Sequence, residues 1–432
     1  MGTNKELEAI RDAATPQGVG IQTKVYANKA RNAEIWDVEG NRYIDLAAGI
    51  AVCNTGHNHP DVIAAVHKQL DRFSHTCFQV APYDVYVKLA ERINAIAPGN
   101  TLKKTIFLTT GAEAVENTIK IARRHTGRTA IISFSGAFHG RTMMAMALTG
   151  KVVPYKKGFG PFPAEVFHVP FPIDYHGISV DDSLAALDKL FKADVEADRV
   201  AAIIIEPVQG EGGFYAAPPG FLKKLREICD EHGIVMIADE IQTGFGRTGK
   251  MFAVEHDGVE PDMMTMAKGL AGGFPLSGVV GKAEIMDSVD AGGLGGTFGG
   301  SPIGCAASHA VLDIIENEDL CGKSVKIGEQ IRAWAEALQN DTDCIGDIRI
   351  NGAMSAIELV QHGDAERPAV QLTKSIAATA VERGVITLTC GVRGNVIRFL
   401  PPLTIGAEIL AEGLTIIGDI IREQAGAIRK AS

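Results

Sequence analysis

IVMIADEIQTGFGRTGKMFAVEHDGVEPDMMTMAKGLAGGFP, residues 234–275, is the stretch that decides the fold. It contains two short apolar runs, of which the first ends at Asp239 and the second ends at Lys268. Continuous apolar runs of this length are typical of strands that are buried on both faces of a parallel sheet. Because ligands bind at the carboxyl ends of such strands, we expect Asp239 and Lys268 to meet at one ligand.

Neither residue means much alone, because charged residues in loops at sheet ends are commonly just solvated. A lysine that acts as a nucleophile does, however, need a partly desolvated position of this kind. The surrounding sequence has to distinguish the two interpretations.

Strand-like and helix-like segments alternate from about residue 104 to residue 281. The apolar run at residues 104–110 breaks at Gly111 and continues into a helical pattern with Glu113 and Glu116 in its first turn. A strand followed by a glycine and a helix start exposes backbone N–H groups to an anion. Read alone, however, this segment favours an ordinary turn between a strand and a helix.

Two more apolar runs, residues 130–134 and 201–205, also end near polar residues. In isolation Phe138 could be core filling, His139 a satisfied loop histidine and Arg141 a solvated charge. Glu206 and Glu211 follow the second run, at its expected carboxyl end. The alternation nevertheless predicts a mostly parallel sheet covered by helices, and hence an α/β fold.

The two chain ends have different patterns. Residues 34–53 suggest a hairpin around the turn at 39–41, and a helix is expected at 61–73. Residues 291–300 form a glycine-rich loop, residues 301–339 are helical, and strands with a closing helix at 408–424 indicate a smaller α+β unit. Arg398 lies within one of these apolar strands, so we expect it to face a crevice or an acidic partner.

Composition restricts the possible partners. The net charge of the 432 residues is -10 without a basic run, which argues against nucleic acid or an anionic membrane and favours a small molecule. No apolar run approaches the length of a membrane span, and the N-terminus lacks the apolar core of a signal peptide. Seven scattered cysteines without a C-x-x-C pair suggest reduced thiols in the cytoplasm and no zinc site.

Two short motifs suggest other chemistry. His57 and His59 have a metal-ligand spacing, but no third ligand is near in the sequence, so no metal is expected. Residues 244–249, GFGRTG, fit a dinucleotide motif and nearly fit a phosphate-binding loop. Met251 replaces the hydroxyl residue that the loop needs, and the segment that follows is short and ends at Pro261. A nucleotide-dependent oxidoreductase therefore stays as a distant alternative.

An anion-binding helix start, an aromatic ring, an acid, a lysine and arginines are what pyridoxal 5'-phosphate requires. The chain resembles the class III aminotransferases of fold type I, and among them bacterial 4-aminobutyrate aminotransferases. The resemblance runs in order through DVEGNRYIDLAAGIAVCNTGH, TTGAEAVENTIKIAR, FHGRT, EPVQGEGGF, IADEIQTGFGRTGK, AKGLAGGFPLSGVVG, GGTF and NVIRFLPPLTI.

This resemblance implies a role for each cofactor residue. Lys268 binds the cofactor covalently and shuttles a proton, and Asp239 pairs with the pyridine nitrogen. Gly111 and Ala112 supply N–H groups that bind the cofactor phosphate, and Phe138 stacks on the cofactor ring. Gln242 lies beside the phenolic oxygen, and Thr297 reaches the phosphate of the cofactor in a neighbouring subunit. The active site is then shared in a homodimer, with a tetramer as a further possibility.

The resemblance also implies how substrates are chosen. Arg141 binds the distal carboxylate, while Arg398 binds the α-carboxylate of glutamate and is neutralised by Glu211 when an ω-amino acid is bound. Ile50 lines the substrate pocket, and Glu206 supports the site. The implied reaction is ping-pong transamination of 4-aminobutyrate with 2-oxoglutarate, giving succinate semialdehyde and glutamate.

Related activities remain open, namely 5-aminovalerate, ornithine or acetylornithine aminotransferase. Two features depart from the sequences of many relatives, namely the loop FGGSP, which follows Thr297, and the isoleucine at position 241. These departures leave the width of the pocket open. The expected organisation is an N-terminal segment at residues 1–60 that joins the small domain, a large cofactor-binding domain at 61–310 and a small domain at 311–432.

Overall fold

The stretch around Asp239 and Lys268 lies in the middle of a seven-stranded sheet in the computed structural model, which describes residues 2–431, with side chains described up to residue 426. All strands run in one direction except β12, which lies antiparallel between β4 and β11. In spatial order the strands are β4 (Lys103–Leu108), β12 (Ser277–Lys282), β11 (Met263–Met266), β10 (Val235–Asp239), β7 (Val200–Ile205), β5 (Ala130–Phe134) and β6 (Val166–Val169). The predicted mostly parallel sheet is confirmed.

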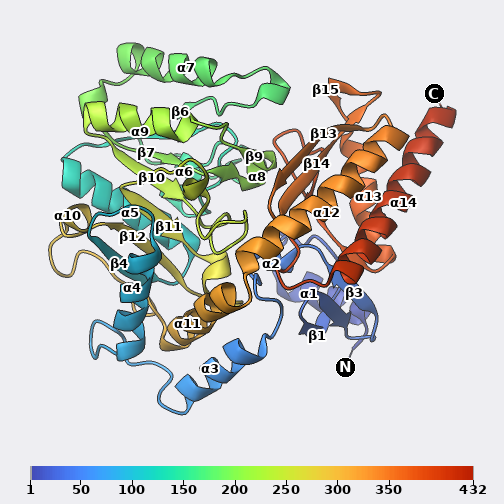
Figure 1. The fold of residues 1–432 in the computed structure, drawn as a ribbon, viewed down its shortest axis with the longest axis horizontal. Coiled ribbons are helices and arrows are strands. Elements are labelled where there is room, and N and C mark those ends of the chain that lie inside the picture. The colour runs from blue at the N-terminus through green and yellow to red at the C-terminus, as the bar shows by residue number, and fades with distance from the viewer. Residues whose placement is uncertain (1, 432) are drawn as a thin grey trace.

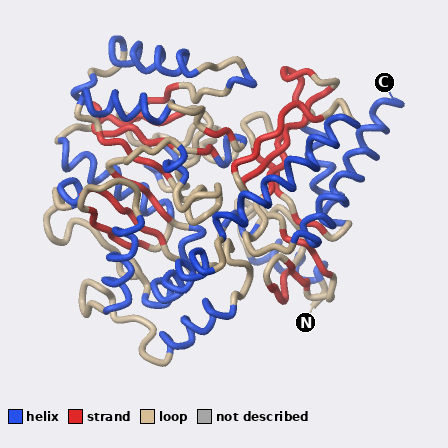
Figure 2. The backbone as a smooth tube through the Cα atoms, in the orientation of Figure 1, coloured by secondary structure: helices blue, strands red, loops and turns tan. Residues whose placement is uncertain are grey.

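Helices cover this sheet, and together they form the large lobe at the left of Figure 1. The central strands are buried along their whole length because every residue of β7, β10 and β11 packs against a neighbouring layer. Figure 2 shows the strands enclosed by helices. The helices of this lobe are α3 (Pro60–Leu70), α4 (Asp84–Ile96), α5 (Gly111–Thr126), α6 (Met143–Leu148), α7 (Val180–Ala193), α9 (Phe221–His232), α10 (Ala283–Met286) and α11 (Pro302–Asn317).

Helix α5 begins directly after β4, as the sequence predicts. Thr110 and Glu113 form a capping box, in which each side chain accepts a hydrogen bond from the other residue's backbone N–H. A cap of this type stabilises a helix by about 1 kcal/mol. Gly127 ends the helix in the left-handed conformation. These signals fix where the first turn of α5 begins, at the carboxyl edge of the sheet.

A second sheet forms the core of the small lobe, at the right of Figure 1. Its strands are β13 (Ile345–Asn351), β14 (Met354–Gln361), β18 (Val396–Phe399) and β17 (Leu388–Cys390), with β15 (Asp364–Pro368) paired to β14. The helices beside it are α12 (Leu320–Asp341), α13 (Val370–Glu382) and α14 (Ala407–Ala431).

The N-terminal segment lies beside this lobe. It contains α1 (Asn4–Ala14), β1 (Ala27–Arg31), β2 (Glu34–Asp37), β3 (Arg42–Asp45) and α2 (Ala48–Ala51). Strand β3 pairs in parallel with β16 (Val385–Ile386), so residues from both ends of the chain share one sheet. The domain boundaries near residues 60 and 310 stay a prediction.

Several expected boundaries differ from the structure. Helix α3 ends at Leu70 rather than residue 73, and the helical region 301–339 is two helices, α11 and α12, separated at Asp319. Asp319 adopts a left-handed φ of 48° and caps α12, which no hydrophobic pattern signals. The remaining short elements are η1 (Asp174–His176), η2 (Ala197–Arg199), β8 (Val208–Gln209), α8 (Gly210–Gly213), β9 (Tyr215–Ala216), η3 (Ala253–His256) and η4 (Lys268–Ala271).

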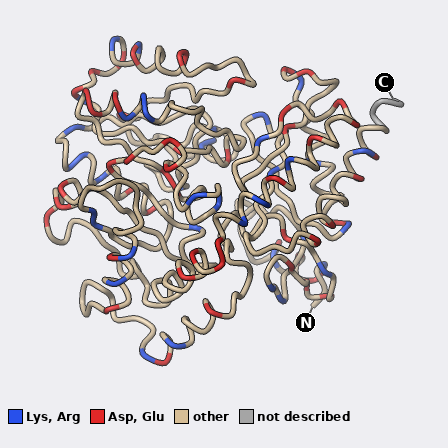
Figure 3. Tube along the Cα trace, viewed as in Figure 1, with Lys and Arg blue, Asp and Glu red and all other residues tan. Residues whose placement is uncertain are grey.

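Charges of both signs are interspersed along the whole trace in Figure 3. Within the described residues, no helix combines the length and apolarity that crossing a membrane requires. Among the residues that the structure describes, no group of three or more His, Cys, Asp or Glu side chains could hold a metal ion. His57 is paired with Asp45 at 2.7 Å.

Candidate active site

A cavity of about 330 Å³ lies at the carboxyl ends of the central strands. Asp239 is the last residue of β10, and Lys268 follows β11, the neighbouring strand. Both line this cavity, so the two charges that the sequence placed at strand ends face the same space. Other residues that line it include Gly111, Ala112, Phe138, His139, Glu206, Ile241 and Gln242.

Asp239 is buried and held from three sides. Its carboxylate accepts hydrogen bonds from the Thr265 hydroxyl at 2.8 Å and the Ile241 N–H at 3.2 Å, and it lies 2.7 Å from His139 Nδ1. Burial acts to lower the pKa of His139, but the hydrogen bond and charge of Asp239 outweigh this effect and raise it. His139 therefore carries a proton that it donates to Asp239, which fixes the orientation of the carboxylate.

The amine of Lys268 is poised to react. Burial lowers the pKa of Lys268 to about 8, although attraction to Glu211 opposes the shift. A large fraction of neutral, nucleophilic amine is then present slightly above neutral pH. The φ of Lys268 is +39°, in the left-handed region that side chains disfavour, and backbone strain of this kind is concentrated at functional sites.

The first turn of α5 opens onto the same cavity through Gly111 and Ala112. Among residues 2–431, no protein group accepts a hydrogen bond from the N–H of either residue. A Cβ at Gly111 would lie 3.0 Å from the Ile241 side chain, so the approach to this helix end is narrow. Two free N–H groups at a helix start form a site for an anion such as a phosphate.

Phe138 lies at the junction of two cavities. Its backbone N–H donates to Glu206 at 2.9 Å, and its ring lies 4.7 Å from the ring of Tyr155. Glu206 lines the first cavity and holds the Phe138 and Gly210 backbones rather than facing the second cavity. Burial raises the pKa of Glu206 to about 7, while the charge of His139 opposes the shift.

The second cavity, of about 470 Å³, shares Phe138 and Lys268 with the first. It brings together the residues that the resemblance assigns to substrate, namely Ile50, Arg141, Glu211 and Arg398. Arg398 donates to Glu211 at 2.5 Å, so the expected acidic partner of this strand arginine is present. Burial acts to raise the pKa of Glu211, but attraction to Arg398 outweighs it and lowers that pKa.

Of the two remaining predicted cofactor residues, Gln242 lies in the first cavity and Thr297 does not. Gln242 lines the first cavity, and its side-chain carbonyl oxygen is buried without a hydrogen-bond partner among the described residues. Thr297 is exposed on the glycine-rich loop and lines neither cavity of this chain. Its predicted contact with a neighbouring subunit stays a prediction.

The family model of class-III aminotransferases matches residues 17–421. The chain belongs to the class-III aminotransferases. The chain is 53% identical to a 5-aminovalerate aminotransferase from Pseudomonas aeruginosa and 51% identical to a 4-aminobutyrate aminotransferase from Escherichia coli. Each alignment covers 98% of this chain and 99% of the relative.

Solved structures agree with this assignment. Ornithine aminotransferase from Toxoplasma gondii superposes with a TM-score of 0.87 at 30% identity, covering 99% of this chain and 96% of that one. A taurine:2-oxoglutarate aminotransferase from Bifidobacterium kashiwanohense, solved with pyridoxal phosphate and glutamate, gives a TM-score of 0.90 at 29% identity, with 98% coverage of both chains. The predicted α/β architecture of fold type I is thereby confirmed.

Sequence reasoning missed two features of this aminotransferase site. His139 was not distinguished from an ordinary loop histidine, because its contact with Asp239 joins residues a hundred positions apart. The sequence does not indicate a role for Tyr155. Its hydroxyl donates to Glu211 at 2.8 Å, and Arg141 lies 4.9 Å from the centre of its ring. It belongs to a loop without hydrophobic periodicity, so the sequence offered no signal.

The nucleotide-like segment GFGRTG has a structural role in this aminotransferase. Arg247 within it is fully buried, and its guanidinium donates to the Pro401 carbonyl at 2.5 Å and to Asn54. Its own carbonyl accepts from Ser324 and Ala353, which belong to the small lobe. The segment joins the two lobes and lines neither cavity. The alternative of a nucleotide-dependent oxidoreductase is therefore abandoned.

Proposed function

We propose that the protein is a pyridoxal-phosphate-dependent aminotransferase of ω-amino acids. In this proposal it transfers the amino group of 4-aminobutyrate to 2-oxoglutarate and releases succinate semialdehyde and glutamate. The observation that carries the proposal is the Glu211–Arg398 ion pair in a cavity that also contains Lys268. Such a pair suits an enzyme whose two substrates differ by one carboxylate beside the reacting carbon.

The residues of the first cavity fit pyridoxal phosphate. The two free N–H groups at the start of α5 suit its phosphate, and Phe138 offers a ring to stack on. The Gln242 side chain, whose carbonyl oxygen has no partner among the described residues, suits the polar edge of the cofactor ring. Lys268 supplies the amine for covalent attachment.

When bound, this cofactor supplies a conjugated cationic ring that accepts the electron pair left when a substrate carbon loses its proton. The Asp239 carboxylate would hold a proton on the pyridine nitrogen and so preserve the cationic form. His139 keeps that carboxylate in place through its contact at 2.7 Å. Asp239 therefore acts electrostatically, and His139 acts through Asp239.

Lys268 would move the proton once its amine has been displaced by the amine of the substrate. The pKa of this amine, lowered to about 8, matches a group that must take up and release a proton near neutral pH. Burial around Lys268 also limits the access of water to the reacting carbon.

Carboxylate recognition belongs to the second cavity. In our proposal Arg141 binds the distal carboxylate of either substrate. Glu211 neutralises Arg398 while an ω-amino acid is bound, because an unpaired guanidinium beside an apolar carbon chain would be costly. When glutamate or 2-oxoglutarate binds, its α-carboxylate takes the place of Glu211 on Arg398. Ile50 would contact the carbon chain of the substrate.

A second candidate substrate is 5-aminovalerate, which is one methylene longer than 4-aminobutyrate. Its support is the relative named for that activity, at 53% identity, which is close to the 51% of the relative named for 4-aminobutyrate. Both amines present one distal carboxylate and no carboxylate at the reacting carbon. In either case one site serves both half-reactions in turn, so we propose a ping-pong order.

We further propose a homodimer with shared active sites, possibly paired into a tetramer, and a cytoplasmic location. Support for the dimer comes from Thr297, whose phosphate-binding role would need a second subunit because it lines neither cavity here. Support for the location comes from the seven cysteines, which are scattered along the sequence and include no C-x-x-C pair. Thr297→Val should weaken cofactor retention without changing the oligomeric state measured by sedimentation, and full retention would contradict the shared site.

The test of the function is a product assay with purified protein, pyridoxal phosphate and 2-oxoglutarate. We expect equal amounts of glutamate and succinate semialdehyde when 4-aminobutyrate is the donor, and parallel double-reciprocal lines as both substrates are varied. Lys268→Ala should abolish both products. Absence of glutamate formation with every ω-amino acid tried would overturn the proposal.

A further inference from the structure

The short helix α8 carries Glu211 between the two lobes. Its chain belongs to the large lobe, yet three successive backbone carbonyls, those of residues 211–213, accept hydrogen bonds from the small lobe. Gly391 N–H donates to the Glu211 carbonyl at 3.1 Å, and Val392 N–H donates to the Gly212 carbonyl at 3.2 Å. Arg349 Nε donates to the third, the Gly213 carbonyl, at 2.9 Å.

Strand register explains how Arg349 reaches this helix. Arg349 on β13 and Arg398 on β18 both pair with Ala356 on β14, so the three residues lie in one row across the sheet. Residues in one such row point to the same face, with neighbouring strands about 4.8 Å apart. The two arginines therefore approach α8 from one face. Arg398 holds the side chain of Glu211, and Arg349 holds the backbone two residues later.

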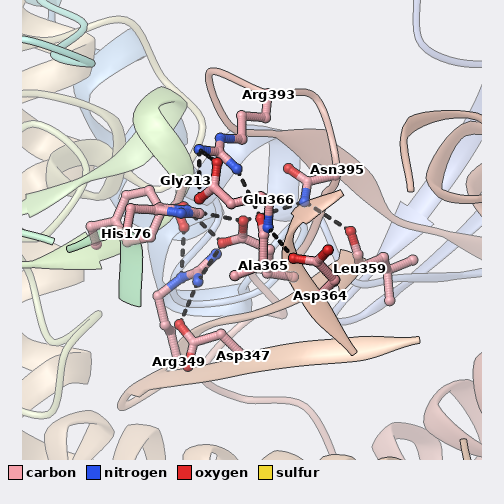
Figure 4. Close-up of polar contacts among 12 residues, drawn as sticks. His176, Gly213, Asp347, Arg349, Leu359, Asp364, Ala365, Glu366, Arg393 and Asn395 are labelled. Carbon is pink, nitrogen blue, oxygen red and sulfur yellow. Dashed lines mark hydrogen bonds and ion pairs between the residues drawn. The ribbon is translucent and has the colours of Figure 1, made fainter. Parts of the chain in front are cut away.

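The guanidinium of Arg349 is itself held rigidly. It donates to Asp347 at 2.6 Å and to the fully buried Glu358 at 2.8 Å, and it stacks 4.2 Å from the centre of the Tyr215 ring. Figure 4 shows Arg349 beside Asp347 at the bottom of the view, with Gly213 above them and His176 at the left.

Glu358 is the shared acceptor of this cluster. The Tyr215 hydroxyl donates to it at 2.7 Å and the Asn395 amide at 3.3 Å, while His176 lies 3.1 Å away. Arg349 Nη2 and His176 Nδ1 have no hydrogen-bond partner among the described residues, but the bonds to Glu358 link groups of both lobes and so restrict their movement. The cluster joins Tyr215, just beyond α8, to β14 of the small lobe.

We infer that Arg349 is a positioning residue for substrate choice, which fixes the backbone of α8 so that only the Glu211 side chain exchanges with a substrate carboxylate on Arg398. The inference rests on the proposed function of the Glu211–Arg398 pair. Arg349 lines neither cavity and does not contact the reacting atoms. With the backbone fixed, Glu211 returns to the same position on Arg398 whenever an ω-amino acid binds.

The deciding variant is Arg349→Lys. Lysine keeps the charge that Glu358 and Asp347 require, but its compact ammonium cannot donate to the Gly213 carbonyl while stacking on Tyr215. We expect kcat/KM for 4-aminobutyrate to fall about tenfold, the effect of one lost charge-assisted hydrogen bond, while kcat/KM for glutamate changes less than about threefold. Each half-reaction is measured separately by stopped-flow absorbance.

Arg226→Lys is the matched control. Arg226 on α9 is another mostly buried arginine, paired at 2.8 Å with Asp262, which directly precedes β11 and so lies at the end of that strand opposite Lys268. Its replacement should therefore leave the ratio of the two half-reactions unchanged. A purely structural role of Arg349 would lower Tm and slow both half-reactions equally, and this result would overturn the inference. An unchanged ratio would also overturn it.

A further variant covers the case in which Arg349→Lys does not fold. Tyr215→Phe keeps the ring beneath Arg349 and removes only the hydroxyl, which donates to Glu358 and lies 2.9 Å from His176 Nε2. It should shift the ratio in the same direction by a smaller factor, and no shift would overturn the inference. A wild-type protein inert towards both 4-aminobutyrate and glutamate would instead refute the proposed function, so the two failures are distinguishable.

Discussion

Replacement of Glu211 by serine perturbs the ion pair at the centre of the second cavity. The side chains of Glu211 and Arg398 are 14% and 6% exposed, so Glu211→Ser leaves a nearly buried guanidinium without its counter-charge. Removing one partner of a buried pair costs about 3–5 kcal/mol. Because Glu211 and Arg398 line a cavity of about 470 Å³, which is large enough for solvent to screen the guanidinium, we reduce this to about 2 kcal/mol, which corresponds to roughly a 30-fold loss in kcat/KM.

The loss should fall on one half-reaction. With 4-aminobutyrate, nothing replaces Glu211 on Arg398, so the full penalty applies. With glutamate, the α-carboxylate of the substrate pairs with Arg398, and kcat/KM should change less than about threefold. Single-turnover absorbance with each amino acid measures both values on the same preparation.

A control variant separates this effect from a general loss of charge. Glu366, on β15 of the small lobe, pairs with Arg393 at 3.2 Å but is largely exposed, so Glu366→Ser should change neither half-reaction. Equal losses with 4-aminobutyrate and glutamate in Glu211→Ser would refute the switch, as would a selective loss with glutamate.

Three further outcomes follow from the first cavity. Gly140→Ala should weaken retention of pyridoxal phosphate about tenfold or more in equilibrium dialysis, because φ is +130° and the new Cβ would lie 2.8 Å from the Cβ of Ala112; unaltered retention would contradict this geometry. Asp239→Asn should slow both half-reactions at least about 100-fold with little change in Tm, and a loss confined to one substrate would argue against an electrostatic role at the ring nitrogen. In cofactor-free protein the pKa of Lys268 is about 8 in the folded state, against 10.5 for an ordinary lysine such as that of the unfolded chain. As pH rises from 8 to 10.5, the folded state has lost this proton while the unfolded state still binds it, so the stability of the folded state increases. The Tm advantage of Lys268→Met over wild type should therefore be largest below pH 8 and shrink across that window, and a constant difference would contradict the lowered pKa.

The sequence was sufficient to predict the centre of the fold. Asp239 and Lys268 end apolar runs on neighbouring strands, and the rule that ligands bind at carboxyl ends predicts that they meet at one site. The start of α5 was predictable for a similar reason, because Thr110, Gly111 and Glu113 are local signals of a capped helix.

The rest of the site depends on contacts between distant residues. Tyr155 reaches Glu211 from an irregular loop, and Arg349 reaches Gly213 across 136 positions, so no local pattern marks either contact. The break at Asp319 depends on a left-handed residue, which helical periodicity does not reveal. The motif GFGRTG has the spacing of a nucleotide-binding loop but does not have that role. Arg247 within it is buried and connects the two lobes by hydrogen bonds, which the spacing of the glycines does not reveal.

The most direct test of the account is the visible absorbance spectrum of the purified protein with pyridoxal phosphate. We predict a band of the lysine-bound cofactor that fades when 4-aminobutyrate is added and returns when 2-oxoglutarate follows, and that is absent from Lys268→Ala. A band that persists unchanged in Lys268→Ala, or that does not respond to any ω-amino acid, would contradict the account.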